Sequence, residues 1–291
     1  MIKKNRFSLF SIVNNFFLVI YAILVIYPIY YTFLISISDY SIASEVVFFT
    51  TKIDLSAYKA VFGDSRFVRS FINSMIVTTV GLILNLLITS CSAYSLSVKG
   101  WKGKNIVYLF VLIPLFFSGG LIPYYLNIRD LHLINSLWVM ILPTMLNLFF
   151  LFILINFFKA LPASLAESAN LDGANDIVIL FRIILPISKP ALVAIGLFYA
   201  VERWNEWWHA LLFINDSAKY PLQLMLREMI MNISMYLNNQ ASSALAQSLN
   251  KVYAPSLKMA TVMVATVPIM LVFPFLQKHF AKGIMIGSIK G

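Results

Sequence analysis

The sequence predicts an all-α protein of one domain that crosses a membrane with six transmembrane helices. Hydrophobic residues make up 60% of its 291 residues and charged residues only 12%, whereas soluble domains have about 25% charged residues. The mean hydropathy is +0.84. The apolar residues gather into six runs, each at least close to the roughly 20 residues that a helix needs to cross a bilayer. The runs cover residues 10–37, 70–96, 105–126, 134–158, 191–213 and 256–280.

The first run follows three basic residues, Lys3, Lys4 and Arg6. Its uncharged stretch continues to Ser38, which is too long for the apolar core of a cleaved signal peptide. We therefore expect a retained first helix. Pro28 lies inside this helix and predicts a kink, because proline removes one backbone hydrogen bond.

The second run follows an interfacial segment at 39–69 and is rich in small and polar residues. Such residues favour close packing between helices over exposure to lipid. We therefore expect the second helix inside a bundle. The residues concerned are Asn73, Ser74, Thr78, Thr79, Gly81 and Asn85.

The third and fourth runs contain residues that break or bend helices. We expect each run to form one transmembrane helix, the fourth with Pro143 and Asn147 inside it. Wherever the third helix is interrupted, neighbouring protein or water must satisfy the freed backbone groups. The interrupting residues of the third run are Pro114, Gly119, Gly120 and Pro123.

A polar stretch at 160–190 separates the fourth and fifth runs. Four ionised side chains at about 2.5 to 3.5 kcal/mol each would cost roughly 10 kcal/mol at the bilayer centre. This stretch must therefore lie outside the hydrocarbon. Its charged residues include Glu167, Asp172, Asp176 and Arg182.

The same stretch has a helical pattern. Ser164 stands three residues before Glu167, which is the capping-box spacing, in which a hydroxyl and a carboxylate bind the first free N–H groups of a helix. The Asp172-Gly173 pair interrupts the pattern, so we predict two short amphipathic helices joined at Gly173. Their apolar stripe would comprise Leu165, Ala169, Ile177, Leu180, Phe181 and Ile184.

The fifth run contains a polar and aromatic cluster. Glu202 lies about 12 residues beyond Pro190, hence roughly 18 Å into a core about 30 Å thick. Ionisable groups at that depth face a water-filled route or a bundle interior, so we predict that the cluster and Asn147 border a translocation path. The alternative is an ion pair within the helix, between Arg203 and Glu202 or Glu206, with the tryptophans at the outer interface. The candidates are Tyr199, Glu202, Arg203, Trp204, Asn205 and Glu206.

The basic residues set the expected orientation. If the N-terminus is cytoplasmic, that side receives about a dozen basic residues against about three acidic ones, and the other side about nine against about seven. We therefore expect both termini and the 160–190 stretch in the cytoplasm. A polar loop at 215–255 would then lie on the outer side.

The 160–190 stretch resembles the EAA loop of ABC-importer permeases. The matching positions are Glu167-Ser168-Ala169, Gly173, Ile183 and Leu185-Pro186, with Ser168 in place of the usual alanine. The resemblance implies a type I permease fold whose two cytoplasmic coupling helices dock into a cleft on a separate ATPase. An ordinary surface amphipathic helix is the alternative. The docking residues implied are Ser164, Leu165, Glu167, Ala169, Asp172, Gly173, Ala174, Ile177 and Phe181.

Further motifs resemble the polysaccharide and complex-oligosaccharide branch of the carbohydrate-uptake permeases, the LplC and YtcP group, which is related to MalG-type permeases. They are Gly119–Tyr124, Trp204-Asn205, Pro221-Leu222-Gln223 and the C-terminal stretch 282–291. The resemblance implies a bacterial plasma-membrane importer of a saccharide, with a second, unlike permease, an ATPase dimer and an extracellular solute-binding protein or lipoprotein. The 215–255 segment would reach into that binding protein. Its contact candidates are Pro221, Gln223, Asn238, Asn239 and Gln240.

No catalytic constellation is evident in the sequence. Neither Lys104 nor Lys282 stands in a phosphate-binding loop, so ATP and Mg²⁺ would be bound by the partner ATPase and this chain would need no cofactor. The three histidines lack partners at metal-ligand spacing, which argues against a metal site and an enzyme. The basic residues are scattered around apolar runs, which argues against nucleic-acid binding.

Two other functions stay open. The same importer architecture serves non-sugar solutes. A secondary transporter driven by an ion gradient is the alternative from another class, although corresponding halves with broken helices are not evident.

Overall fold

The computed structural model describes residues 9–38, 48–49, 52–98, 100–238 and 254–287. The regular elements of these residues are helices, and their one β-bridge pairs Ser38 with Ile53. The chain divides into two compact units, one of residues 1–65 and 226–267 and one of residues 66–225 and 268–291. Whether the chain works as a single domain stays a prediction.

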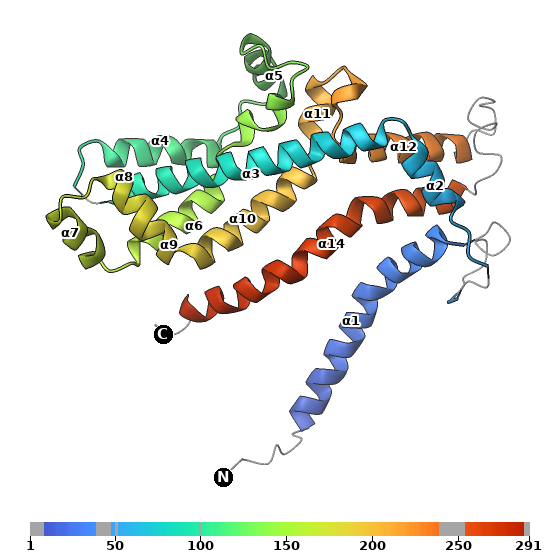
Figure 1. The fold of residues 1–291 in the computed structure, drawn as a ribbon, viewed down its shortest axis with the longest axis horizontal. Coiled ribbons are helices and arrows are strands. Elements are labelled where there is room, and N and C mark those ends of the chain that lie inside the picture. The colour runs from blue at the N-terminus through green and yellow to red at the C-terminus, as the bar shows by residue number, and fades with distance from the viewer. Residues whose placement is uncertain (1–8, 39–47, 50–51, 99, 239–253, 288–291) are drawn as a thin grey trace. The chain divides into compact units, whose positions relative to one another are not determined.

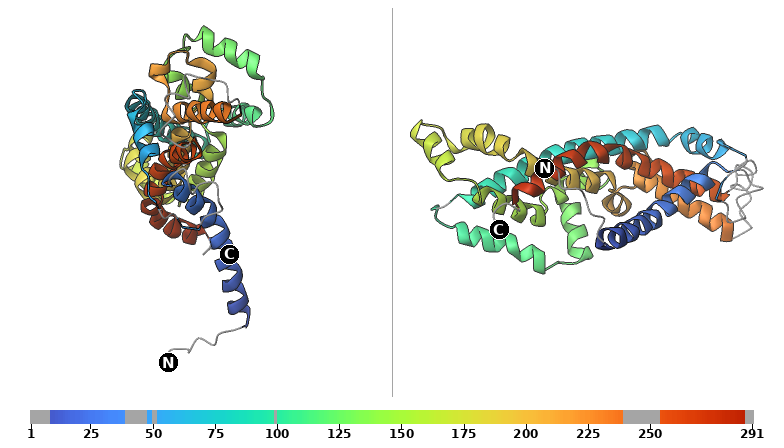
Figure 2. Two further views of the ribbon diagram at one scale, coloured as in Figure 1. Left: turned by 90° about the vertical axis from the view of Figure 1, so that its right-hand side faces the viewer. Right: turned by 90° about the horizontal axis from the view of Figure 1, so that it is seen from below.

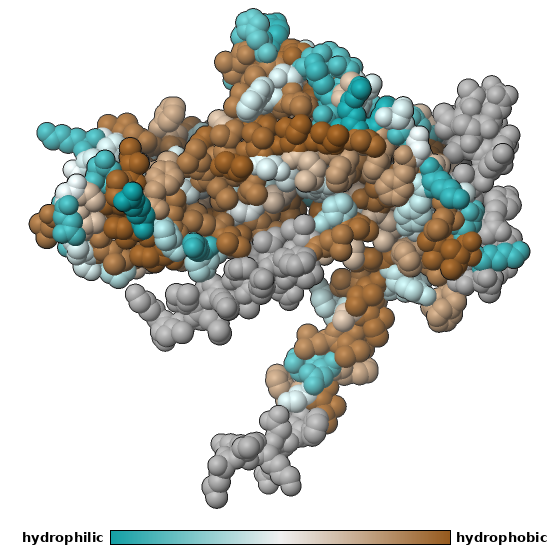
Figure 3. All heavy atoms as spheres, viewed as in Figure 1, coloured by the Kyte–Doolittle hydropathy of each residue, from teal (hydrophilic) through white to brown (hydrophobic). Residues whose placement is uncertain are grey.

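The first unit contains α1 (Leu9–Ser36), α2 (Ser56–Gly63), most of α12 (Leu222–Asn238) and the first half of α14 (Ala254–Gly287). Helix α1 runs through Pro28 and exposes large apolar side chains along most of its length, as Figure 3 shows. At the start of α2, the side chain and backbone N–H of Ser56 donate to Asp54 and hold the pKa of that carboxyl below its ordinary value.

The second unit is organised around α3, which packs along α10 and α6 (Figure 1). Asn73 and Ser74 on α3 hold the chain just before and at the start of α12. The Asn73 amide donates to the carbonyl oxygens of Ala218 and Tyr220 at 2.9 and 3.0 Å, and the Leu222 N–H donates to Ser74 Oγ at 2.8 Å. Asn73, Ser74 and Asn85 are buried, as expected for a helix inside a bundle, whereas Thr79 is exposed. The α-helices of this unit are α3 (Phe67–Ser97), α4 (Lys104–Phe116), α5 (Leu121–Asp130), α6 (Leu148–Lys159), α7 (Ser164–Leu171), α8 (Asp176–Ile179), α9 (Leu185–Ile187), α10 (Lys189–Trp204) and α11 (Trp208–Phe213).

Three helices of the described residues are long and apolar enough to cross a membrane, namely Phe10–Ser36, Phe67–Ser97 and Ala254–Leu271. Two bent pairs raise the number to as many as five. The shorter apolar helix Lys104–Phe116 lies in the third predicted run. This pattern is consistent with six spans.

The fourth run is not the single helix that we predicted. It begins with two 3-10 turns, η1 (Leu137–Met140) and η2 (Leu142–Thr144), and only α6 continues as an α-helix, at an angle of 46° to them. Pro143 lacks the N–H that a continuous helix would need, and the side chain of Asn147 caps a new helix instead. Half of this run is therefore irregular backbone.

The third and fifth runs are also divided. Helices α4 and α5 are separated at residues 117–120, where the chain changes direction sharply (Figures 1 and 2). The fifth run divides at 205–207 into α10 and α11, a break that no proline or glycine announces. The predicted polar loop at 215–255 contains the 3-10 turn η4 (Ser217–Lys219) and the 17-residue helix α12.

Candidate functional site

The two predicted short helices are present and meet at Gly173. Helix α7 ends at Leu171, Gly173 has a φ of +81°, and α8 starts after Asn175, whose side chain accepts a hydrogen bond from the Val178 N–H at 2.9 Å. A left-handed φ favours glycine because it lacks a Cβ. Both the break and its residue are therefore confirmed.

The predicted capping box between Ser164 and Glu167 is wrong. Ala163 is the N-cap residue, with helical backbone angles, and Ser164 is already the first helical residue. The early N–H groups of α7 bind the backbone carbonyls of Pro162 and Ala163 instead, since the turn after Pro162 is itself helical. Glu167 is exposed in the first turn of the helix.

The apolar residues of this segment divide into a buried set and an exposed set. Ala169, Ile179, Leu180 and Ile184 belong to a core cluster with residues of α3, α6 and α10. Leu171, Ile177 and Phe181 are 89%, 68% and 45% exposed. The stripe predicted from spacing is therefore wrong as one face. The break at Gly173 separates α7 from α8, and the π-helix from Leu180 to Ile184 departs from the 3.6-residue repeat on which the prediction rested.

The exposed apolar residues Leu171, Ile177 and Phe181 are together called the coupling surface below, after the docking role that the resemblance to the EAA loop implies. Leu171 is its most exposed member and escaped the spacing argument, although its place just before the Asp172-Gly173 stop was a usable signal. Of the other predicted docking residues, Ser164, Glu167 and Asp172 are exposed, Leu165 and Ala174 are half-buried, and Ala169 is buried.

A pocket of about 580 Å³ adjoins the coupling surface, between α8 and the end of α3. The Tyr94 hydroxyl donates to Asp176 at 3.3 Å, and the Trp101 indole donates to the Ser95 carbonyl at 2.9 Å. The first contact ties α8 to α3, and the second ties the turn that follows α3 back to α3. The lining residues are Cys91, Tyr94, Ser95, Val98, Trp101, Asp176, Ile177, Leu180 and Phe181.

The polar cluster of the fifth run is spread over different environments. Tyr199 is fully buried, with its hydroxyl 2.7 Å from the Thr89 hydroxyl, and Trp204 is buried with its ring edge-on to Phe71. Arg203 is only 3% exposed. Its guanidinium donates to Asn85 and to groups of η1 and η2, so all three of its nitrogens are used there and not in the ion pair with Glu202 or Glu206 that was the alternative.

Asn147 and Glu202 come together from two helices. The Asn147 amide donates to Glu202 Oε1 at 3.3 Å, while Asn147 Oδ1 accepts from the N–H groups of Phe149 and Phe150 and caps α6. The Asn147 N–H also donates to the Tyr199 hydroxyl at 3.1 Å. Glu202 is exposed and Asn147 half-buried, so this pair offers a donor and an acceptor at a surface.

Glu206 has a partner that the sequence argument missed. Its carboxylate accepts a hydrogen bond from the His209 N–H at 3.0 Å at the start of α11, and it lies 3.1 Å from His209 Nδ1. The i, i+3 spacing of the two residues was the available signal. Asn205 is exposed in the break before α11.

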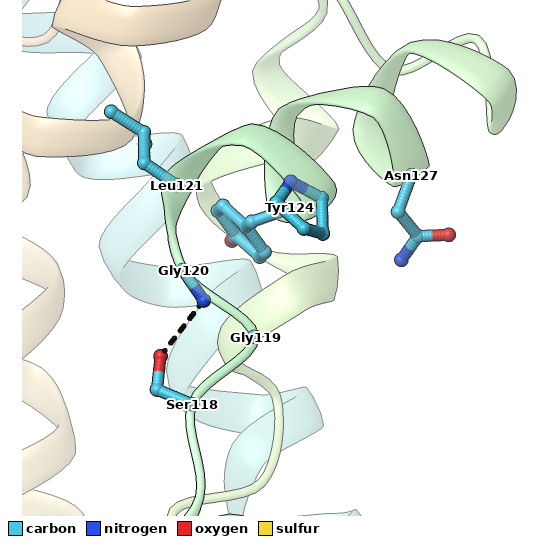
Figure 4. Close-up of a pocket in the computed structure, with 7 residues that line it drawn as sticks. Ser118, Gly119, Gly120, Leu121, Tyr124 and Asn127 are labelled. Atoms are coloured by element: carbon cyan, nitrogen blue, oxygen red, sulfur yellow. Dashed lines mark hydrogen bonds between the residues drawn. The ribbon is translucent and has the colours of Figure 1, made fainter.

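A second pocket of about 490 Å³ lies at the break between α4 and α5 (Figure 4). Gly120 has a φ of +82°, and its N–H donates to the Ser118 hydroxyl at 3.3 Å. Tyr124 lies between Ser118 and Asn127 in this view, and its ring also contacts the His209 ring edge-on at 6.0 Å. The interruption predicted at Gly119-Gly120 is therefore confirmed.

The predicted binding-protein contacts are only partly accessible. Pro221 is buried, because Asn73 and Ser74 hold the chain on both sides of it, so it offers no contact surface. Gln223 is half-buried. Asn238 ends α12, and Asn239 and Gln240 lie outside the described residues.

A scan against protein-family models finds no match, but individual relatives are similar over nearly the whole chain. The polygalacturonan/rhamnogalacturonan transport system permease protein YtcP of Bacillus subtilis is 39% identical over 99% of this chain and 100% of its own length. Protein LplC of Bacillus subtilis is 44% identical over 81% of this chain and 79% of its own.

More distant relatives and a solved structure agree with these. The arabinooligosaccharides transport system permease protein AraQ of Bacillus subtilis is 26% identical over 98% of both chains. A crystal structure of a bacterial ABC transporter involved in the import of the acidic polysaccharide alginate matches 95% of this chain and 100% of that chain, with a TM-score of 0.85 and 30% identity. The chain therefore belongs to the family of permease subunits of ABC sugar transport systems.

Proposed function

We propose that this permease carries an oligosaccharide or polysaccharide fragment that an extracellular solute-binding protein delivers, driven by ATP hydrolysis on a separate ATPase dimer. The coupling surface supports this most directly. It exposes large apolar side chains on two short helices whose other side is fixed in the core cluster. Exposed apolar clusters on such a segment fit docking into a cleft of a partner protein.

The packing offers a route for the coupled motion. Leu180 and Ile184 connect α8 to the core formed with α3 and α6, and the chain continues through α9 into α10, which carries Glu202. A cleft that grips Ile177 and Phe181 would move these packed helices as a body, since tightly packed cores shift between discrete arrangements and do not deform smoothly.

The pair of Asn147 and Glu202 is our candidate contact with the solute. A carboxylate oxygen and an amide N–H side by side suit the neighbouring hydroxyl groups of a sugar ring. Phe149, whose N–H binds Asn147 Oδ1, has a side chain that is 64% exposed, and we propose that it offers an apolar face for the ring carbons. Asn205 and Glu206 follow on the same chain segment.

The saccharide assignment draws on the names of the relatives. These proteins are named for transport of polygalacturonan and rhamnogalacturonan, arabinooligosaccharides, and alginate.

We propose that ATP and Mg²⁺ are bound by the ATPase subunit and that a second, unlike permease completes the pathway. Both termini and the coupling surface would face the cytoplasm, and α12 and the segment after it would face the binding protein.

Uptake by purified complexes in vesicles tests this function. We expect labelled oligogalacturonides or arabino-oligosaccharides to accumulate only with ATP and the loaded binding protein. We expect Ile177→Glu to abolish association with the ATPase, because it puts a charge on the apolar coupling surface. Leu131→Glu is the control, since Leu131 is 59% exposed at the end of α5, away from that surface. Uptake that follows an ion gradient without ATP would contradict the proposal and support a secondary transporter.

A further inference from the structure

Arg203 is the one charged side chain among the fully buried polar residues that the structure describes. It lies near the end of α10, in the fifth apolar run. An arginine within the hydrocarbon region is costly and is kept when it binds other protein groups or a water-filled route. Its surroundings therefore indicate what it does.

The Arg203 side chain binds the irregular backbone of the fourth run. Its Nε donates to Asn85 Oδ1 at 3.1 Å, and its terminal nitrogens donate to the carbonyl oxygens of Met140 and Thr144 and to the Thr144 hydroxyl. Asn85, fully buried on α3, donates in turn to the carbonyl oxygens of Thr144 and Met145 at 3.0 and 2.9 Å.

These carbonyl groups need outside partners. Met140 and Thr144 end two short 3-10 turns, and the groups at a helix end have no partner within the helix. In a membrane no bulk water replaces that partner. The guanidinium carries five N–H donors on three nitrogens in a planar fork, so it reaches acceptors that lie apart from one another, whereas a lysine has three donors on a single atom.

The backbone of α3 makes room for this arrangement. A Cβ built on Gly81 would lie 2.9 Å from Arg203 Cδ and 3.2 Å from its Nε. Any larger residue at position 81 would therefore displace the arginine side chain. Gly81 lies one helical turn before Asn85, so both residues serve the same contact from one side of α3.

We propose that Arg203 and Asn85 form a clasp that holds the broken fourth span in place, so that Asn147 is positioned opposite Glu202. Asn147 follows Met145 by two residues, and its N–H binds Tyr199, one turn before Arg203 on α10. Arg203 is thus a positioning residue and not a solute contact. The consequence for transport rests on the proposed function, which assigns the Asn147 and Glu202 pair to the translocation path.

A cysteine reporter measures the geometry without depending on transport. Cys91 is the single cysteine, so Phe149→Cys in a Cys91→Ser background gives one exposed thiol beside Asn147. We expect Arg203→Lys and Gly81→Ala to change its labelling rate in the assembled complex by about threefold or more, because loosening the clasp alters local opening. Arg129→Lys is the matched control, since Arg129 is exposed and pairs with Asp130. Unchanged labelling in both clasp variants would overturn the proposal.

Uptake per assembled complex then tests whether Arg203 acts through Asn147. We expect Arg203→Lys to lower uptake about tenfold, which is the cost of leaving a buried polar group unsatisfied. In a chain that already carries Asn147→Ser, adding Arg203→Lys should lower uptake by less than about twofold, because the effects of two substitutions that act through one shared partner do not add. Equal losses in both backgrounds would overturn the positioning role. If the clasp variants alter the labelling rate but Asn147→Ser and Glu202→Gln transport normally, the clasp stands and the assignment of this pair to the translocation path is wrong.

Discussion

At the residue scale, individual side chains have roles that spacing alone does not reveal. Arg203 stands one and three residues from two carboxylates, so an ion pair within the helix was the alternative to a place on the translocation path. The structure instead directs its three nitrogens to Asn85 and to the carbonyls of Met140 and Thr144. The unsatisfied carbonyls of a broken helix compete for the donor, and they exist only because the fourth run is broken.

Gly173 gives a test at this scale. Its φ is +81°, and an added Cβ would meet no other atom within 4 Å, so a substitution there costs backbone strain and no clash. We expect Gly173→Val to cost about 1–2 kcal/mol and to lower uptake and stimulated ATPase activity together. Gly173→Asn is the matched variant and should retain more of both, because asparagine tolerates the left-handed conformation. Equal activity of the two variants would show that this backbone conformation does not matter for coupling.

At the element scale, boundaries depend on capping groups as well as on apolar runs. The start of α6 at Leu148 follows from Asn147, whose side chain accepts from two N–H groups of the first turn. The start of α7 follows from the turn after Pro162 and not from Ser164. The glycines at 119–120 predicted their break, and Pro143 was an available signal that the one-helix prediction did not use. Nothing in the residues at 205–207 predicted the division of α10 from α11.

Substitutions at Asn147 separate its two roles. Serine caps a helix about as well as asparagine, and alanine costs about 0.5–2 kcal/mol at such a position. We therefore expect Asn147→Ser to keep the melting temperature of the purified complex but to lower uptake, because it loses the amide that binds Glu202. Asn147→Ala should lower both. If Asn147→Ser transports normally, the amide has no part in the translocation path.

At the scale of the whole molecule, the orientation in the membrane can be measured. A single cysteine at Leu171, in the Cys91→Ser background, should react with a membrane-impermeant thiol reagent in inside-out vesicles and not in intact cells, because the positive-inside rule predicts a cytoplasmic position for this face. Bound ATPase should protect it, since Leu171 is 89% exposed on the coupling surface. Leu131→Cys should show the reverse sidedness. Reaction of the Leu171→Cys protein from outside would contradict the orientation.

The membrane class, the approximate apolar runs and the two short helices joined at Gly173 are determined by the sequence itself. They depend on composition, on hydropathy over about 20 residues and on local backbone preference, which are properties of neighbouring residues. Only the tertiary structure decided that Arg203 binds the broken fourth span, that Asn147 meets Glu202, and that Leu171, Ile177 and Phe181 stay exposed while Leu180 and Ile184 are buried. These contacts join residues far apart in the chain, and no local pattern encodes which carbonyl or core position a distant side chain will reach.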